Sequence, residues 1–313
     1  MAALTACEKV ILYEDIESEP LMVVNGIQHV GEPARLSVER SSFYIESEKD
    51  LRVKDVHVDL YVNGTFKESL QVRDSIISDT YITIDPDGNE HEEEQIRYAF
   101  NYCEGDQLRF EVSSSEFDEV AVAETTMPST PNIVSFDTLR IEEHGEGYYA
   151  DYHQVYFALT VDDPAGKDYY NLNPKDGFED YNSFYSSDPV FADFMNIVHI
   201  DDLFGGSEYI GRGEYNMFND SYFDGKRYGV NFYTNTYMED GQFTSPFVME
   251  VSMVDYNLYQ FKKSYTSYQY TDNGLLGIFT EPTQVYSNVQ NGVGVVGSQS
   301  LSVSMVVDLR EEE

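Results

Sequence analysis

The chain has 313 residues, with 57 acidic residues against 19 Lys and Arg, and its formal net charge at pH 7 is −38. This charge repels phosphate backbones and anionic headgroups, which argues against nucleic-acid binding and against membrane docking through basic patches. Cationic ligands, divalent metals and simple solubility outside the cell are compatible with it, and no apolar stretch approaches the roughly 18 residues that predict a transmembrane helix.

The first seven residues indicate a lipid anchor. Leu4-Thr5-Ala6-Cys7 has the pattern at which a bacterial lipoprotein signal peptidase cuts, directly before a cysteine that then carries acyl chains. Only five residues separate Met1 from Cys7, fewer than the apolar region of about 7 to 15 residues in a secretory signal, so we expect the chain to start inside its signal. The sequence therefore predicts lipidation of Cys7, with residues 1–20 as signal remnant and tether. An ordinary cysteine without lipid is the alternative.

Residues 21–128 predict an immunoglobulin-like β-sandwich. Apolar and polar residues alternate with a period of two, and Asn63-Gly64 is a strong hairpin signal. The Cys, Trp, Cys core of true immunoglobulin domains is missing, and a lone thiol such as Cys103 is usually a small buried hydrophobe. The prolines of residues 127–131 interrupt strand pairing, so we place a domain boundary there. The predicted strands are LMVVNGIQ, ARLSVERSS, VHVDLYV, TFKESLQV, TYITI, QLRFEVSS and VAVAETT.

Residues 132–313 predict a second β-rich domain, sandwich or barrel-like, so the predicted fold class of the whole chain is all-β. Its pattern loses regularity between residues 171 and 224, where Asp188-Pro189 predicts one short helix. Structured insertions often carry function, which makes this one the leading candidate surface. The predicted strands are YHQVYFALTVDDPAG, RYGVNFYTN, FVMEVSMVD, YQFKKSYTSYQY and SLSVSMVVDL.

Three motifs resemble known sites but lack the context that those sites need. Residues 292–297 read GxGxxG, yet a strand pattern follows instead of a helix, so glycines in a turn or bulge fit better than a nucleotide site. His91 has no second histidine at the spacing of a zinc site. Residues 85–89 resemble the start of a calcium loop, but Ile96 stands where the bidentate glutamate belongs. We therefore predict no metal or cofactor, and expect cations to act on this acidic fold by screening alone.

No catalytic constellation is found in the sequence. A GxSxG elbow, an SxxK motif and a Cys/His nucleophile pair are all missing. Paired carboxylates for glycoside hydrolysis cannot be selected, because their separation in space is the diagnostic. The sequence predicts no catalytic residues and a non-enzymatic protein, with a carboxylate-dependent, glycan-active enzyme as the minor alternative.

Several segments together resemble one family across nearly the whole chain. They are Cys7-Glu8-Lys9, the strand LMVVNGIQ, the pair QLRFEVSS and VAVAETTMP, the turn at residues 163–166 before Tyr169-Tyr170, and the ending FTEPTQVYSNVQNGVGVVG. The chain resembles the domain-of-unknown-function 4249 family of Bacteroidota outer-membrane lipoproteins. The resemblance implies a surface-facing outer-membrane lipoprotein that partners a TonB-dependent transporter, and it implies no catalytic or binding residue.

We therefore expect a non-enzymatic accessory or ligand-capturing subunit of such a transporter, attached to the membrane through its lipid alone. Aromatic residues are favoured at interfaces, so the expected partner or ligand contacts are the insertion's Tyr181, Phe184, Tyr185, Tyr209 and Tyr222. Each of them has packing beneath its own loop as its alternative. A structural or adhesive surface module with no small-molecule ligand is the alternative function.

Overall fold

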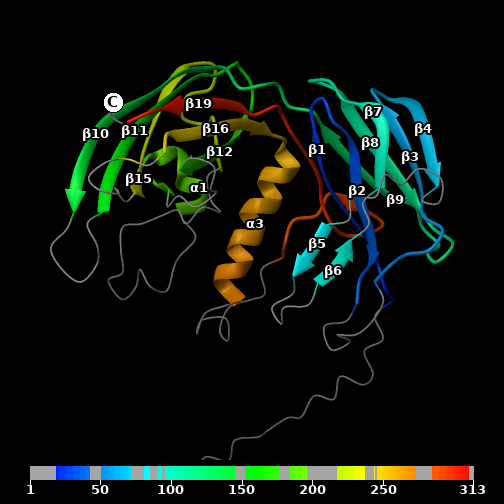
Figure 1. Cartoon of the computed structure of the whole chain (residues 1–313). Helices are drawn as coiled ribbons and strands as arrows, with labels where there is room; N and C mark the ends of the chain where they lie inside the picture. Colours follow the sequence, from blue (N-terminus) through cyan, green and yellow to red (C-terminus); the bar gives the residue numbers. More distant parts are fainter. Residues whose placement is uncertain are drawn as a thin grey trace, which may run out of the picture.

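The computed structural model describes residues 19–42, 51–71, 81–84, 90–93, 96–144, 152–176, 184–195, 217–236, 243, 245–272 and 284–309. The described part of the chain is built mainly of strands layered in several sheets, which confirms the predicted all-β class. Figure 1 shows two groups of strands joined across the top of the molecule, with helix α3 (Tyr256–Asp272) between them. None of the described helices has the length and apolar character needed to cross a membrane.

The first group of strands comes mainly from the N-terminal part of the chain. Its bounds are β1 (Met22–His29), β2 (Pro33–Arg40), β3 (His57–Val62), β4 (Thr65–Gln71), β5 (Tyr81–Ile84), β6 (Glu90–Glu93), β7 (Ile96–Asn101), β8 (Gln107–Ser113) and β9 (Ala121–Thr126). The second group is β10 (Ile133–His144), β11 (Tyr152–Asp162), β12 (Tyr169–Asp176), β13 (Phe184–Tyr185), β14 (Met217–Asn219), β15 (Arg227–Thr236) and β16 (Phe247–Val254). Three strands follow α3, namely β17 (Val289–Gln290), β18 (Val296–Gln299) and β19 (Val303–Val307).

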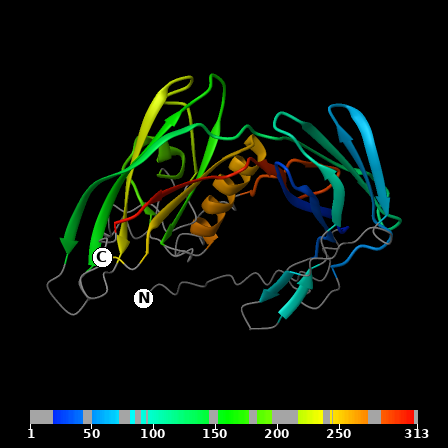
Figure 2. The ribbon, with the colours of Figure 1, turned by 45° about the horizontal axis from the view of Figure 1, so that its top comes forward.

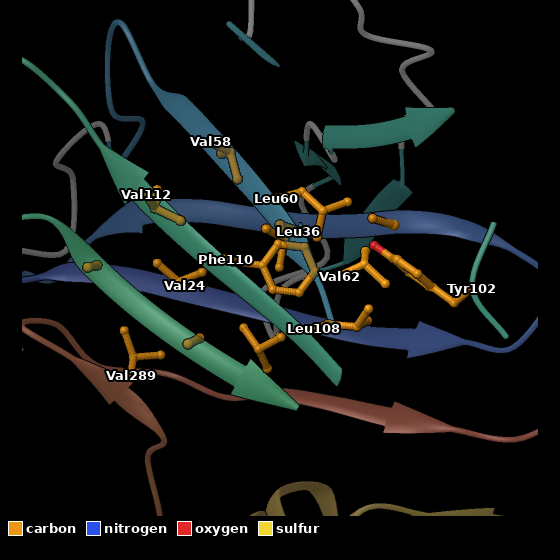
Figure 3. Close-up of a cluster of buried hydrophobic side chains, with 14 of the residues drawn as sticks. Val24, Leu36, Val58, Leu60, Val62, Tyr102, Leu108, Phe110, Val112 and Val289 are labelled. Carbon is orange, nitrogen blue, oxygen red and sulfur yellow. The ribbon is translucent and has the colours of Figure 1, made fainter. Parts of the chain in front are cut away.

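Alternating apolar residues build the core of the first group. A five-stranded sheet has the order β17-β9-β8-β3-β4, and the inward residues of β3 and β8 face those of β1 and β2 (Figure 3). Phe110 and Leu60 are fully buried there. Asn63 and Gly64 both have positive φ, of 53° and 74°, which is the backbone of a two-residue hairpin turn that matches the strand twist. The hairpin predicted from Asn63-Gly64 is thus confirmed.

One sheet runs through both groups of strands. Its order is β14-β12-β16-β18-β1-β2-β7, with β19 pairing with β16, and β1 pairs with β18 in parallel. The buried side chains nevertheless divide near the predicted boundary, because Met127 belongs to the first core and Phe136 to the second. Val289 and Val296 return to the first core from the end of the chain. The two-domain division stays a prediction, and strand pairing crosses it.

A second, four-stranded sheet packs against the part of this large sheet that contains β12 and β16. Its order is β10-β11-β15-β13, and its apolar side chains pack with those of β12 and β16 in an aromatic core. Phe157 contacts Phe136, Phe232 and Phe247 with ring centroids 4.9, 5.5 and 5.2 Å apart. The two sheets thus form a two-layer sandwich, and the loops that connect one sheet to the other lie at its ends.

The predicted strand YQFKKSYTSYQY is wrong, because these residues belong to α3. Asp255 starts this helix, and its Oδ1 accepts the N–H of Leu258 at 2.9 Å, which is the geometry of an N-terminal cap. Leu258 and Tyr259 are then buried against β16 and β14 residues. In Figure 2 the helix again lies between the two groups of strands. Tertiary packing overrides the strand preference of Tyr and Thr here.

The short helix predicted after Asp188-Pro189 is confirmed. A 3-10 helix, η2 (Pro189–Phe191), runs into α1 (Ala192–Met195). Asp188 is the cap, since its Oδ1 accepts the N–H of Val190 at 3.2 Å. Cys103, expected to be buried, is exposed beyond the end of β7.

The glycines of residues 292–297 allow close packing of the backbone. A Cβ on Gly294 would lie 2.2 Å from the Val24 carbonyl oxygen, and the φ of Gly294 is 118°. A Cβ on Gly297 would lie 2.7 Å from the Cβ of Leu258. These glycines therefore bring β18 against β1 and α3, and a strand follows them, as the sequence predicted.

Candidate functional site

The predicted contact residues are only partly covered by the structure. Cys7, Tyr181, Tyr209 and the calcium-like residues 85–89 lie outside the described residues. Phe184 pairs with Thr234 through the backbone of β13, and the described part does not include its side chain. The first residues of the insertion, 171–176, are not irregular, because they form the end of strand β12.

Tyr185 and Tyr222 differ in their surroundings. The Tyr185 ring is half-buried and stacks on Tyr233 with centroids 5.0 Å apart, so it packs against its own sheet. Tyr222 lies in the loop between β14 and β15, and 57% of it is exposed. Of these two residues, Tyr222 is the more exposed to solvent.

The loop that holds Tyr222 meets a second loop at one end of the sandwich. Residues 163–168 connect β11 to β12, and residues 220–226 connect β14 to β15. Both loops cross from one sheet to the other, because β11 and β15 pair in the four-stranded sheet while β12 and β14 pair in the large sheet. Because β11 pairs with β15 and β12 pairs with β14, the two loops lie side by side.

Three aspartates gather where these loops meet. One carboxylate oxygen from each of Asp163, Asp220 and Asp224 lies within 4.8 Å of the others. Asp163 and Asp220 are buried and Asp224 is exposed. The Gly225 N–H donates to Asp163 Oδ2 at 2.8 Å, and the Gly166 N–H donates to Asp224 Oδ1 at 2.9 Å. Each loop therefore supplies a carboxylate that accepts a backbone hydrogen bond from the other.

The hydrogen bonds of the two buried aspartates are unequal. Asp163 Oδ1 accepts the hydroxyl of Tyr170 at 2.6 Å, so both of its carboxylate oxygens have donors. Asp220 is 4% exposed, and its Oδ2 has no hydrogen-bond partner within the described part of the chain. A buried carboxylate oxygen with no donor is costly.

A fourth carboxylate adds to the negative charge of this corner. Asp168 is half-buried, and burial, followed by the charges of Asp163, Asp220 and Asp224, raises its pKa to about 6. Burial also raises the pKa of Asp220. Two charged carboxylates within 4.8 Å, as in the trio of Asp163, Asp220 and Asp224, repel by roughly 3 kcal/mol or more for an effective dielectric constant of about 20. Among the described residues, none of the four forms an ion pair with a lysine or arginine.

A separate groove lies where the five-stranded sheet meets the start of α3. Its volume is about 710 Å³, within the range of about 300 to 1,000 Å³ that ligand pockets occupy. Tyr61 and Tyr256 contribute aromatic surface, and 52% of Tyr256 is exposed. Polar residues of the wall are Gln107, Arg109, Glu124, Thr125, Thr126, Asp255, Asn257, Asn288 and Gln290.

Side chains from several segments hold the wall of this groove in place. Arg109 lies over the Tyr61 ring, 5.5 Å from its centroid, and its Nε is 3.4 Å from Glu124 Oε1. The Asn288 amide donates to the Glu124 carbonyl oxygen at 2.9 Å, and the Asn257 amide donates to the same oxygen at 3.0 Å. The groove is thus a preformed polar and aromatic surface contributed by both ends of the chain.

Sequence analysis did not select the aspartate cluster or the groove. The signal for the cluster was the pair of Asp-rich turns DDPAGKD and NDSYFDG, but Asp163 and Asp220 are 57 positions apart and only the strand pairing joins them. The groove is lined by residues as far apart in the sequence as Tyr61 and Gln290. Its formation depends on α3, which was predicted as a strand.

Comparison with known proteins gives one result that covers most of the chain. The profile of the family described as Domain of unknown function (DUF4249) matches residues 9–303. No curated protein matches the sequence.

Proposed function

The chain belongs to the DUF4249 family, and we propose that it is a surface-exposed outer-membrane lipoprotein, anchored through Cys7, that captures a ligand for a TonB-dependent transporter. It acts by binding, without catalysis. The observation that carries the capture role is the groove of about 710 Å³ at the junction of the five-stranded sheet and α3. Its volume is typical of ligand sites, and two tyrosine rings lie among polar side chains that are held in place.

The composition of the groove limits the class of ligand. Its wall combines the Tyr61 and Tyr256 rings with amides and one arginine that is paired with Glu124. Such a surface suits a polar, neutral or cationic ligand that stacks on tyrosine and hydrogen-bonds to amides. The net charge of −38 disfavours polyanions at long range.

The transporter contact is assigned to the β14–β15 loop. Tyr222 is exposed there, and exposed tyrosine is enriched at the centres of protein interfaces. Tyr181, Phe184 and Tyr209 stay predicted contacts of the same partner, and Tyr185 packs on Tyr233 of its own sheet.

Affinity purification of the tagged protein from native outer membranes tests this function. A barrel protein should co-purify in stoichiometric amount, and Tyr222→Ala should reduce its recovery. Tyr268→Ala is the matched control, because Tyr268 is also an exposed tyrosine but lies on α3. Recovery of the wild-type protein without any barrel would contradict the transport role and favour the adhesive module.

A further inference from the structure

We propose that Asp163, Asp220 and Asp224 form a calcium site that clamps the β11–β12 loop to the β14–β15 loop. The proposal is independent of the transport function, since it rests on the geometry of this corner of the sandwich alone. It assigns a cation to a place where sequence analysis expected none.

The donor set suits a hard divalent cation. The three converging groups are all carboxylates, with one oxygen from each within 4.8 Å of the others. Hard oxygen donors of this kind suit Ca²⁺ and Mg²⁺, whereas zinc prefers His and Cys. Oxygens this close can share one calcium ion, because two ligands on opposite sides of it are at most about 4.8 Å apart when each Ca–O bond is about 2.4 Å. Calcium also tolerates irregular cages of protein carboxylates, whereas magnesium demands near-ideal octahedral geometry and usually keeps several waters.

Asp220 has a buried carboxylate oxygen that needs a partner. This side chain is 4% exposed, and its Oδ2 has no hydrogen-bond donor among the residues that the structure describes. Asp163, which is equally buried, uses both oxygens to accept from Tyr170 and Gly225. A cation at the meeting point of the three carboxylates supplies Asp220 with the partner that it lacks.

Backbone hydrogen bonds hold the ligands in place. The Asp220 N–H donates to the Asp168 carbonyl oxygen at 3.1 Å, and the Phe223 N–H donates to the Asp220 carbonyl oxygen at 2.7 Å. Gly225 has a φ of 67°, and a Cβ there would lie 3.4 Å from the Cβ of Ala165. The two loops are thus fitted closely together before a cation binds, and the site is preformed.

A bound calcium ion has a consequence for the surface beside it. Tyr222 lies between the two ligands Asp220 and Asp224 in sequence, and its ring is exposed. Fixing both carboxylates fixes the loop that presents this ring. Bound calcium therefore further restrains the loop that presents Tyr222.

Calorimetric titration of the calcium-stripped protein tests the site. We expect one Ca²⁺ per chain, still bound when Mg²⁺ is in excess, with affinity reduced about tenfold or more in Asp220→Asn and in Asp224→Asn because each loses one charged ligand. Asp137→Asn is the matched control, since Asp137 is an exposed aspartate of β10, and it should bind as the wild type does.

Thermal unfolding distinguishes calcium binding at one site from general screening of the negative charge. Calcium should raise the Tm of the wild type and of Asp137→Asn to a plateau, and should leave Asp220→Asn almost unchanged. Without calcium, Asp220→Asn should be at least as stable as the wild type, because one of four repelling charges is gone. If that variant fails to fold, Asp224→Asn, altered at an exposed position, decides the question. Absence of stoichiometric binding in the wild type, wild-type affinity in both variants, or displacement by Mg²⁺ would overturn the proposal.

Discussion

Asp255 joins three segments that are far apart in the sequence. Its Oδ1 accepts the N–H groups of Leu258 and Ser298 at 2.9 and 3.1 Å, and its Oδ2 accepts the Thr125 hydroxyl at 2.8 Å. Burial raises the pKa of this carboxyl, and the hydrogen bonds from Leu258 and Thr125 oppose that rise. One side chain thus caps α3, accepts a hydrogen bond from the backbone of β18 and anchors β9 beside the groove.

We predict that Asp255→Ala lowers the free energy of unfolding by about 3 kcal/mol. The loss combines a helix cap, about 1 kcal/mol, with buried donors left without an acceptor, about 1 to 3 kcal/mol each. Urea unfolding measures it. Asp255→Asn should recover part of the loss because asparagine also caps helices, and Asp137→Ala, on an exposed strand position, should stay within about 0.5 kcal/mol of the wild type. A neutral Asp255→Ala would contradict this role.

His29 makes a pH-dependent contribution to the free energy of unfolding, and the direction of its pKa shift determines the sign. Burial lowers its pKa, Glu32 opposes that effect and Arg35 adds to it. The unfolded chain therefore binds this proton more readily, so the contribution of His29 is complete above the unfolded pKa of about 6.5 and is lost as pH falls toward the lower folded pKa. Stability measured by urea unfolding should decline over that window, and less so in His29→Gln. Equal slopes in the two proteins would show that the shift is negligible.

At the scale of elements, the glycine-rich ending brings backbones together. Gly294→Ala should destabilise the fold by roughly 1 to 3 kcal/mol or more, because its φ of 118° suits glycine and the new Cβ would lie 2.2 Å from the Val24 carbonyl oxygen. Gly229→Ala is the control, since nothing lies within 4 Å of its Cβ position, and it should change stability little. Thermal unfolding compares the two. Similar effects of both substitutions would show that close approach is not what Gly294 provides.

Most strands could be predicted because alternation and turn chemistry are local signals. The runs at β3 and β8 alternate strictly between buried and partly exposed residues, and Asn63-Gly64 determines the hairpin between β3 and β4. The helix α3 could not be predicted in this way. Its many Tyr and Thr residues favour strands, and the helix depends on the Asp255 cap and on the burial of Leu258 and Tyr259, which are set by the rest of the fold.

At the scale of the whole molecule, the last strands complete the first core. β18 pairs with β1 and β17 pairs with β9, and Val289 and Val296 are buried among N-terminal residues. Alternation indicates that a segment is a strand but does not name its partner, so this long-range pairing could not be predicted from the sequence. For the same reason the aspartate cluster could not be predicted, because its loops meet only through the pairing of β11, β12, β14 and β15.

A fragment of residues 19–131 should consequently not unfold cooperatively by itself. Without β17 and β18, two sheet edges lose their partners and two core positions are empty, and unpaired edges and cavities both reduce stability. Adding a peptide of residues 284–300 should restore a cooperative urea transition. Cooperative unfolding of the fragment alone would instead support the independent N-terminal domain that the sequence predicted.

The central claim is that this protein works at the cell surface in contact with an outer-membrane barrel. Photo-crosslinking in growing cells tests it most directly, with the crosslinking amino acid placed at position 222 and, as control, at position 268. We predict that position 222 yields one dominant product with a TonB-dependent transporter and that position 268 does not. If position 222 yields no barrel product while the protein is present in the outer membrane, the claim is contradicted.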